Sequence, residues 1–292
     1  MSDTPLNNPH RIDALLRRSS ELAQVSDTAR LDLELLLCHI LKKERSFLFS
    51  RPEHELTDDQ LEQFSALLEQ RKAGHPVAYL TGTRDFWSLE LSVEPSTLIP
   101  RPDTEHLVET ALELCDHKPQ RALDLGTGTG AIALALAKER PGWTVYGCDR
   151  IPEAVALAKR NAMRNQLERV TFVESNWFSA FAGEGFDLIV SNPPYIVDND
   201  PHLAEGDVRF EPASALTSGI DGLDDIRLIS QQSPAYLNDD GWLMMEHGYH
   251  QGEQVRDILH DNGFVDIRTV QDLAGHDRIT LGRKPGKPAE EG

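Results

Sequence analysis

Hydrophobic residues recur at helical spacing throughout the first quarter of the chain. Between residues 11 and 74, leucine and isoleucine return at steps of three and four positions, which is the period of an amphipathic helix. The clearest helix follows Thr57, which together with Gln60 matches a capping box, and it stops at Gly74. This pattern predicts a small all-helical domain over residues 1–76, in which the leucines form the core.

The pattern changes to strand-like alternation in the segment that follows. Over residues 77–100, apolar and polar side chains alternate around Gly82 and Ser88, which predicts a β-hairpin that links two domains. Prolines then flank Arg101, and a helix is expected to begin within the next few residues, because proline favours the first helical positions. Arg101 can either position a loop of a binding site or brace the linker between the domains, and we favour bracing.

From residue 121 onward, segments with strand and helix patterns alternate. The expected strands span residues 121–125, 144–149, 170–174, 186–191, 241–246, 264–270 and 278–283, and the expected helices span residues 130–139, 152–166, 222–237 and 251–262. Such alternation is typical of an α/β domain with a mostly parallel, doubly wound sheet. This domain is expected to cover residues 101–285, and residues 286–292 are expected to form a disordered tail.

The charge is distributed unevenly. The chain of 292 residues has a net charge of −19, and its first 80 residues contain 10 basic and 13 acidic side chains. The remaining 212 residues therefore contain 19 basic and 35 acidic side chains, a net charge of −16. Such a surface repels a phosphate backbone, so no direct nucleic-acid binding is expected.

The cysteines and the N-terminus indicate the compartment. Cys38, Cys115 and Cys148 are far apart and lie in apolar stretches, so we expect buried thiols and neither disulfides nor a zinc site. No stretch has the length and apolar character of a signal peptide or a membrane span. A cytoplasmic protein without membrane contact, monomeric and without a bound metal, is expected.

A glycine-rich stretch, Gly126-Thr127-Gly128-Thr129-Gly130, follows the first strand of the α/β domain and opens its first helix. Glycine at alternate positions permits a tight turn and a close approach of a ligand, and the helix N-terminus offers free N–H groups. The spacing differs from the dinucleotide fingerprint, and no Lys-Ser/Thr pair follows as in a P-loop. The stretch therefore predicts a ligand other than NAD or a nucleoside triphosphate.

An acidic residue, Asp149, closes the second strand about 20 residues beyond the glycines, where a carboxylate can accept bonds from both ribose hydroxyls. Taken alone, Asp149 is as readily explained as a helix cap before Pro152. Together with the glycine loop and the doubly wound sheet, it resembles the S-adenosylmethionine-dependent methyltransferases. That resemblance implies a class I, Rossmann-like, seven-stranded domain that binds S-adenosyl-L-methionine and releases S-adenosyl-L-homocysteine.

The segment Asn192-Pro193-Pro194-Tyr195 follows the fourth strand and resembles the signature of methyltransferases that act on planar amino groups. The prolines force a turn at the carboxyl end of the strand. The Asn192 side-chain oxygen and the Pro193 carbonyl can accept two N–H bonds from a planar nitrogen group, and Tyr195 can cover its flat face. Adenine in nucleic acid and the side-chain amide of glutamine both fit this description.

Three longer segments resemble one family, the bacterial peptide chain release factor glutamine methyltransferases. These segments span residues 81–87, 98–105 and 207–212, and the similarity extends over the chain apart from its ends. The resemblance implies methylation of the glutamine in the Gly-Gly-Gln motif of release factors, with a helical domain that recognises the substrate. The related enzyme that methylates a ribosomal protein ranks second, an adenine N6 methyltransferase third, and a donor-binding regulatory protein without catalysis is the alternative from another class.

The same resemblance assigns the site residues. It implies that Gly126 to Gly130, Asp149, Trp177 and Asn192 contact the methyl donor, and that Asn192 to Tyr195 hold the glutamine, with Asn192, Pro193 and Tyr195 as the catalytic set. From the residues alone, Trp177 is as well explained as a core side chain. His247, after the fifth strand, can line the pocket, but a catalytic role for it is not expected.

Overall fold

The computed structural model describes residues 8–115 and 118–286, which form two compact units. The first unit contains the chain up to Thr83 together with Pro201–Phe210, and the second contains Arg84–Asp200 and the chain from Glu211 onward. The first unit therefore includes a short stretch that follows the Asn-Pro-Pro-Tyr segment in sequence. The expected disordered tail lies outside the described residues, except for Gly286.

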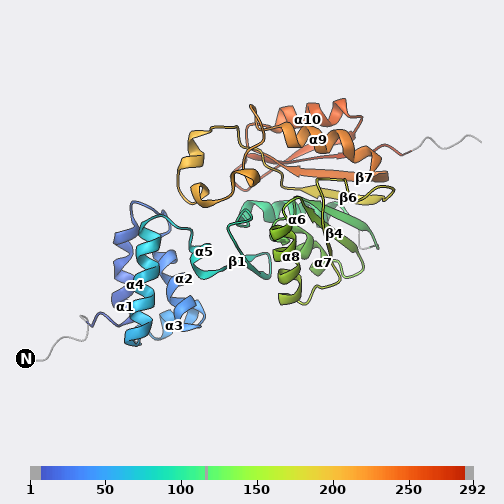
Figure 1. The fold of residues 1–292 in the computed structure, drawn as a ribbon. Coiled ribbons are helices and arrows are strands. Elements are labelled where there is room, and N and C mark those ends of the chain that lie inside the picture. Colours follow the sequence, from blue (N-terminus) through green and yellow to red (C-terminus); the bar gives the residue numbers. More distant parts are fainter. Residues whose placement is uncertain (1–7, 116–117, 287–292) are drawn as a thin grey trace, which may run out of the picture. The chain divides into compact units, whose positions relative to one another are not determined.

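The first unit is helical, as its leucine pattern predicts (Figure 1). Its elements are α1 (Ile12–Leu16), η2 (Arg17–Leu22), α2 (Ala29–Leu41), α3 (Arg45–Ser50), α4 (Asp58–Lys72) and α5 (Val77–Thr81), followed by η4 (Pro201–Ala204) and η5 (Val208–Phe210) from the later stretch. Leucines and isoleucines of α1 and α2 join Phe64 and Leu68 of α4 in one core of almost fully buried side chains. The spacing of the leucines and isoleucines by three and four positions therefore reflects their packing in the core of this unit.

Helix α4 begins with the capping box expected from the sequence. The Thr57 hydroxyl accepts a bond from the backbone N–H of Gln60, and the Gln60 side chain accepts one from the backbone N–H of Thr57. Both bonds satisfy N–H groups that a helix start leaves without partners.

We expect Thr57→Ala to lower the free energy of unfolding of the helical unit by about 1 kcal/mol, because an N-cap hydroxyl is lost. Urea denaturation followed by circular dichroism measures this change. Ser65→Ala, in the interior of the same helix, is the matched control, since the Ser65 hydroxyl donates to the Leu61 carbonyl within the helix and caps no helix end. If Thr57→Ala were no less stable than the control, the capping box would not stabilise α4.

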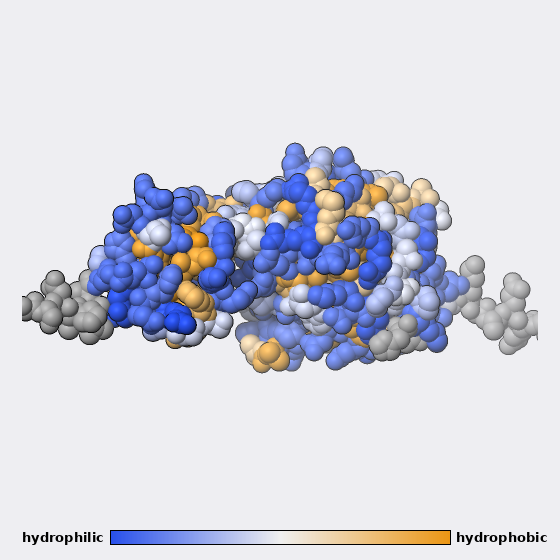
Figure 2. Space-filling view, turned by 90° about the horizontal axis from the view of Figure 1, so that it is seen from below, coloured by the Kyte–Doolittle hydropathy of each residue, from blue (hydrophilic) through white to orange (hydrophobic). Residues whose placement is uncertain are grey.

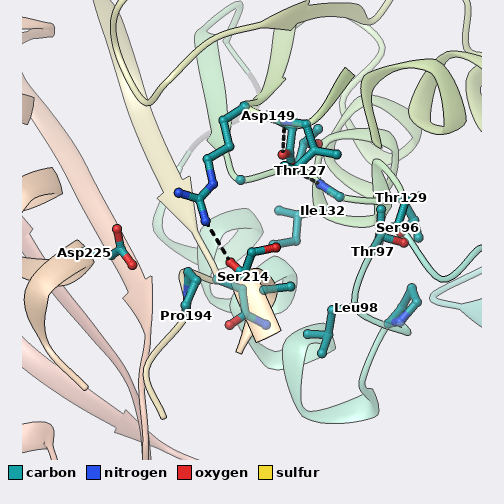
Figure 3. A pocket seen from close by; sticks show the side chains of 18 of the residues that line it. Ser96, Thr97, Leu98, Thr127, Thr129, Ile132, Asp149, Pro194, Ser214 and Asp225 are labelled. Carbon is teal, nitrogen blue, oxygen red and sulfur yellow. Dashed lines mark hydrogen bonds between the residues drawn. The ribbon is translucent and has the colours of Figure 1, made fainter. Parts of the chain in front are cut away.

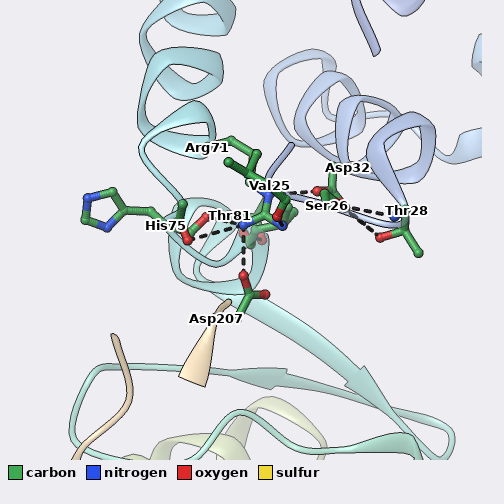
Figure 4. Close-up of polar contacts among 10 residues, drawn as sticks. Val25, Ser26, Thr28, Asp32, Arg71, His75, Thr81 and Asp207 are labelled. Carbon is green, nitrogen blue, oxygen red and sulfur yellow. Dashed lines mark hydrogen bonds and ion pairs between the residues drawn. The ribbon is translucent and has the colours of Figure 1, made fainter. Parts of the chain in front are cut away.

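A buried arginine connects separate parts of the helical unit (Figure 4). The Arg71 side chain, 5% exposed, donates to Asp32 on α2 at 2.7 Å and to Asp207 at 2.8 Å, and also to backbone carbonyls such as that of His75. A guanidinium that leaves water needs this number of acceptors to offset its desolvation. Arg71 therefore ties the stretch around Asp207 to the helices.

The segment between the helical unit and the glycine loop differs in part from the sequence prediction. A β-hairpin is present, made of β1 (Thr83–Phe86) and β2 (Leu89–Ser92). However, Val77–Thr81 forms the helix α5 and not a strand. The apolar residues Val77 and Leu80 are three apart and both pack against the helical core, so the helical period fits them as well as alternation does.

The second unit is built on a seven-stranded sheet with the strand order β5-β4-β3-β6-β7-β9-β8. The strands are β3 (Arg121–Leu125), β4 (Thr144–Asp149), β5 (Thr171–Glu174), β6 (Phe186–Ser191), β7 (Leu237–Glu246), β8 (Val265–Gln271) and β9 (Asp277–Arg283). Strands β5, β4, β3, β6 and β7 run parallel, and β9 is antiparallel to both of its neighbours. The α/β fold with a mostly parallel sheet is confirmed.

Helices cover both faces of the sheet (Figure 1). They are η3 (Pro102–Thr104), α6 (Glu105–Leu114), α7 (Ala131–Glu139), α8 (Pro152–Arg164), η6 (Ala213–Ala215), α9 (Asp224–Gln232), η7 (Ser233–Ala235) and α10 (Gly252–Asp261). Apolar residues of α6, α7 and α8 form one core with alternate strand residues such as Ala122, and α9 and α10 form a second core with their neighbours such as Leu123. Strand side chains alternate between faces, so each central strand supplies both cores.

On the face seen in Figure 2, hydrophilic residues predominate, in agreement with the high content of charged residues. Among the helices of the described ranges, none combines the length and the apolar character that a membrane span requires. Cys115 and Cys148 are buried as expected, whereas Cys38 is only half-buried, and all three are free thiols.

Candidate active site

Three central strands end at the same level and bring the expected site residues together. Leu125 at the end of β3 pairs with Cys148 on β4 and with Ser191 on β6. The glycine loop, Asp149 and Asn192 come directly after these three residues. The site therefore lies at the carboxyl edge of the sheet. Strand β3 has β4 on one side and β6 on the other, so the strand order reverses here, and this is the usual ligand position in open α/β sheets.

The glycine loop has a backbone that only glycine adopts easily. Gly126, Gly128 and Gly130 have φ angles of +69°, +52° and +85°, in the left-handed region that side chains disfavour. A β-carbon at Gly130 would lie 3.1 Å from the Phe172 ring, so this glycine allows α7 to pack closely on the sheet. Gly126 and Gly128 instead line a cavity.

Asp149 connects the second strand to this loop. One carboxylate oxygen accepts a bond from the N–H of Gly128 and the other from the N–H of Ile151, each at 3.0 Å. Burial raises the pKa of Asp149, and the two backbone bonds oppose this shift. Each oxygen retains a lone pair that can accept a ribose hydroxyl.

A second carboxylate, Asp124, stabilises the glycine loop through a hydrogen bond from Thr127. It is fully buried, accepts bonds from the Thr127 hydroxyl at 2.6 Å and from the N–H of Ala133 at 3.2 Å, and has a pKa raised to about 7 by burial. Its other oxygen is buried and has no hydrogen-bond partner among the described residues. Because Asp124 lies within a buried strand, its sequence position alone does not predict these contacts with the loop.

Trp177 forms one wall of the cavity. A β-carbon at Gly126 would lie 3.5 Å from the Trp177 ring, and Trp177 has a φ angle of +50°, which is uncommon for a large side chain. The Ser175 hydroxyl donates to the Trp177 carbonyl at 2.7 Å and helps to hold this conformation. Trp177 also packs against the second core, so the core and cavity interpretations of the sequence both apply.

The cavity has an empty volume of about 960 Å³, which includes space open to solvent (Figure 3). Of the residues assigned from the sequence, it is lined by Gly126, Thr127, Gly128, Thr129, Asp149, Trp177, Asn192 and Pro194. Gly130, Pro193 and Tyr195 are not part of its lining. Residues that the sequence analysis had not assigned complete it, among them Thr97, Leu98, Arg101, Thr104, Ser214 and Asp225.

Polar contacts hold the Asn-Pro-Pro-Tyr segment in place. The Asn192 side-chain N–H donates to the Thr104 hydroxyl at 3.0 Å, and the Tyr195 hydroxyl donates to Glu246 at 3.3 Å. The Gln251 side chain donates to the Tyr195 carbonyl at 3.1 Å. Burial raises the pKa of Tyr195 well above its usual range and the pKa of Glu246 to about 7. The segment is therefore a fixed turn.

Two residues left open by the sequence have defined positions. Arg101 pairs with the buried carboxylate of Glu211 at 2.8 Å and also lines the cavity. His247 is fully buried, and its ring nitrogens bond to the Gly248 carbonyl and to the Thr280 hydroxyl. Burial lowers the pKa of His247. His247 thus joins β7 to β9 and does not line the cavity.

The sheet order, the glycine loop after β3 and the acid after β4 define the class of the protein as a class I, Rossmann-like methyltransferase, for which S-adenosyl-L-methionine is the methyl donor. Family models match in agreement: residues 13–82 match the PrmC N-terminal domain, and residues 103–214 match the methyltransferase small domain. The chain belongs to the family of release factor glutamine methyltransferases.

Relatives with similar sequences show the family to which the chain belongs. The chain is 56% identical to the release factor glutamine methyltransferase of Pseudomonas aeruginosa and 50% identical to that of Escherichia coli, and each match covers 92% of this chain and 97% of the relative. A solved methyltransferase from Pyrococcus furiosus is 17% identical, with a TM-score of 0.52 over 76% of this chain and 98% of that one, which supports the fold alone.

Proposed function

We propose that this protein transfers a methyl group from S-adenosyl-L-methionine to the side-chain amide nitrogen of glutamine in the Gly-Gly-Gln motif of peptide chain release factors. The observation that carries the proposal is the fixed Asn192 amide at the wall of a cavity that also contains a glycine loop and an acid suited to ribose. The names of the relatives give the substrate.

The residues around the cavity fit the methyl donor. Asp149 has lone pairs for two hydroxyls, and Gly126 and Gly128 of the glycine loop line the cavity, where a ligand can approach their backbone closely. We assign donor binding to Gly126, Thr127, Gly128, Thr129, Asp149, Trp177 and Asn192, with Gly130 supporting the loop through helix packing. When bound, S-adenosyl-L-methionine supplies an electrophilic methyl group on a sulfonium.

The protein contributes position and hydrogen-bond acceptors. An amide nitrogen is a weak nucleophile because its lone pair is delocalised, so it must be held in line and supported as positive charge develops on it. The Asn192 oxygen and the Pro193 carbonyl accept its two N–H groups, and Pro194 and Tyr195 shape the turn that presents them. No strong general base is needed, because the proton becomes acidic once the nitrogen is alkylated.

The remaining assignments concern partners and domains. The helical domain, residues 1–76, recognises the release factor, and the linker, residues 77–100, joins it to the catalytic domain, residues 101–285. The enzyme acts as a monomer in the cytoplasm and does not bind nucleic acid directly, since a net charge of −16 beyond residue 80 opposes contact with phosphates. Methylation of a ribosomal protein is the second candidate, because the same turn serves any accessible glutamine amide.

Incubation with donor labelled in its methyl group tests the proposal. We expect label in purified release factor, and none in duplex DNA or in a release factor whose Gly-Gly-Gln glutamine is replaced by alanine. Label in ribosomal protein but not in release factor would favour the second candidate. Label in DNA would contradict the proposed substrate class.

A further inference from the structure

A fully buried asparagine, Asn161 on α8, connects the glycine loop to the end of the β-hairpin. Its side-chain N–H groups donate to the Thr129 carbonyl at 2.9 Å and to the Ser92 carbonyl at 3.0 Å. Its side-chain oxygen accepts a bond from the backbone N–H of Ser92 at 2.7 Å. One side chain therefore joins the glycine loop, α8 and the last residue of β2.

These contacts require a side-chain amide. An amide has two N–H donors and an accepting oxygen, and the three bonds of Asn161 use both donors and the oxygen. An ionised carboxylate of the same shape only accepts hydrogen bonds, and a hydroxyl has a single donor. Neither replaces an amide between two carbonyl groups.

The Thr129 carbonyl depends on the donor that Asn161 supplies. In a regular helix this carbonyl would accept a bond from the N–H of Ala133, four residues later. Here the N–H of Ala133 donates to Asp124 at 3.2 Å. Thr129 is 3% exposed, and a buried carbonyl needs a hydrogen-bond partner. Asn161 therefore provides the contact that the start of α7 does not.

Both segments that Asn161 joins continue into the wall of the cavity. Thr129 lines the cavity, and so do Thr97 and Leu98 of the stretch that follows β2. This stretch lies against the glycine loop, since a β-carbon at Gly128 would be 3.8 Å from the β-carbon of Thr97. Asn161 itself is not part of the lining, so it acts on a ligand only through these two segments.

We propose that Asn161 is a positioning residue for the methyl donor, which holds the glycine loop and residues 93–101 at the spacing that the donor requires. Without the contact to the Thr129 carbonyl, the loop has more conformational freedom, and binding must restrict it again at a cost in affinity. This inference rests on the proposed function, because it requires that the glycine loop binds the donor.

Calorimetric titration with S-adenosyl-L-homocysteine tests the inference. Asn161→Asp keeps the shape and the acceptor for the Ser92 N–H but has no donor for the two carbonyls when ionised. We expect Kd to rise about tenfold, and KM for S-adenosyl-L-methionine to rise in parallel. At saturating donor, kcat should stay within about twofold. Asn161→Ala, which has no side-chain donor at any pH, should give the same result.

Asn165→Asp is the matched control. Asn165 lies one turn later on α8, and its side-chain N–H groups donate to the Glu90 carbonyl of β2 at 3.0 Å and to the Asn161 carbonyl within the helix. The substitution therefore removes a contact between α8 and β2 and leaves the contact of Asn161 with the glycine loop in place. We expect its Kd to stay within about twofold of that of the unaltered protein.

The readouts separate positioning from stability. Loss of folded protein lowers the number of binding sites that calorimetry counts, whereas displacement of the loop raises the Kd of the molecules that remain folded. Thermal unfolding identifies a temperature at which each variant is folded.

Unchanged Kd in both Asn161 variants would overturn the inference, as would an equal rise in Asn165→Asp. Fewer sites with an unchanged Kd, or failure of both variants to fold, would show that Asn161 serves stability alone. If the unaltered protein did not bind S-adenosyl-L-homocysteine, the proposed function itself would fail. Donor binding without methylation of release factor would refute the proposed substrate and leave the role of Asn161 intact.

Discussion

Asn192→Ala is expected to lower the rate of methyl transfer about a hundredfold or more while the protein still binds the methyl donor. The side-chain oxygen of Asn192 accepts a hydrogen bond from the reacting amide and stabilises the positive charge that develops on it. Removing one oriented polar contact to a developing charge costs on the order of a hundredfold in rate. Alanine also removes the contact with Thr104, so water can enter next to the reacting group.

Single-turnover kinetics with release factor and labelled donor measure this loss, and calorimetry with S-adenosyl-L-homocysteine measures the retained affinity. Asn238→Ala is the matched control, because Asn238 is exposed, lies at the opposite end of the strands and, among the described residues, bonds through its side chain to Asp187 alone. A wild-type rate for Asn192→Ala would exclude the role assigned to this residue. Loss of donor affinity equal to the loss of rate would place Asn192 in donor binding alone.

Asp149→Ala is expected to weaken donor affinity by one to two orders of magnitude. Hydrogen bonds to a charged group contribute about 1.5–3 kcal/mol each, which corresponds to roughly ten- to a hundredfold in Kd. The variant also frees the N–H groups of Gly128 and Ile151, which Asp149 holds. At saturating donor, kcat should fall much less than the affinity, because Asp149 does not touch the reacting amide.

Calorimetric titration with S-adenosyl-L-homocysteine checks the effect of Asp149→Ala. Asp261→Ala, an exposed aspartate at the end of α10, is the control for loss of one negative charge. Unchanged affinity in Asp149→Ala would refute the ribose contact and leave Asp149 as a residue that only shapes the loop. A large fall in kcat at saturating donor would show that the loop conformation matters for chemistry as well.

Sequence patterns were sufficient where one physical requirement dominates. Buried parallel strands need apolar runs, and β3, β4 and β6 lie where those runs predicted them. The capping box of Thr57 needs only residues three apart, and it is present. Residues 77–81 were wrongly predicted as strand because five residues show too little of either period to distinguish helix from alternation.

The sequence predicted the motifs of the candidate site, but not the residues that hold these motifs in place. Local sequence identifies the glycine loop and Asn192, since a turn at a strand end restricts residue choice. Thr104 lies 88 residues from Asn192 and Glu246 lies 51 residues from Tyr195 in sequence, and only the folded chain brings Thr104 to the Asn192 side chain and Glu246 to the Tyr195 hydroxyl. Thr104 lies in the segment 98–105 that resembles the family, but nothing in that segment reveals its contact with Asn192. The role of Asp124 could not be predicted for a similar reason, because its hydrogen bonds with Thr127 and Ala133 form only when the loop folds against the strand.

The most direct test of the central claim is mass spectrometry of release factor after reaction with the enzyme and S-adenosyl-L-methionine. We expect a mass increase of one methyl group, assigned by fragmentation to the side-chain nitrogen of the Gly-Gly-Gln glutamine, and a far smaller modified fraction with Asn192→Ala at the same early reaction time. An unmodified glutamine after reaction with an enzyme that binds the donor, or a methyl group on another residue, would contradict the account.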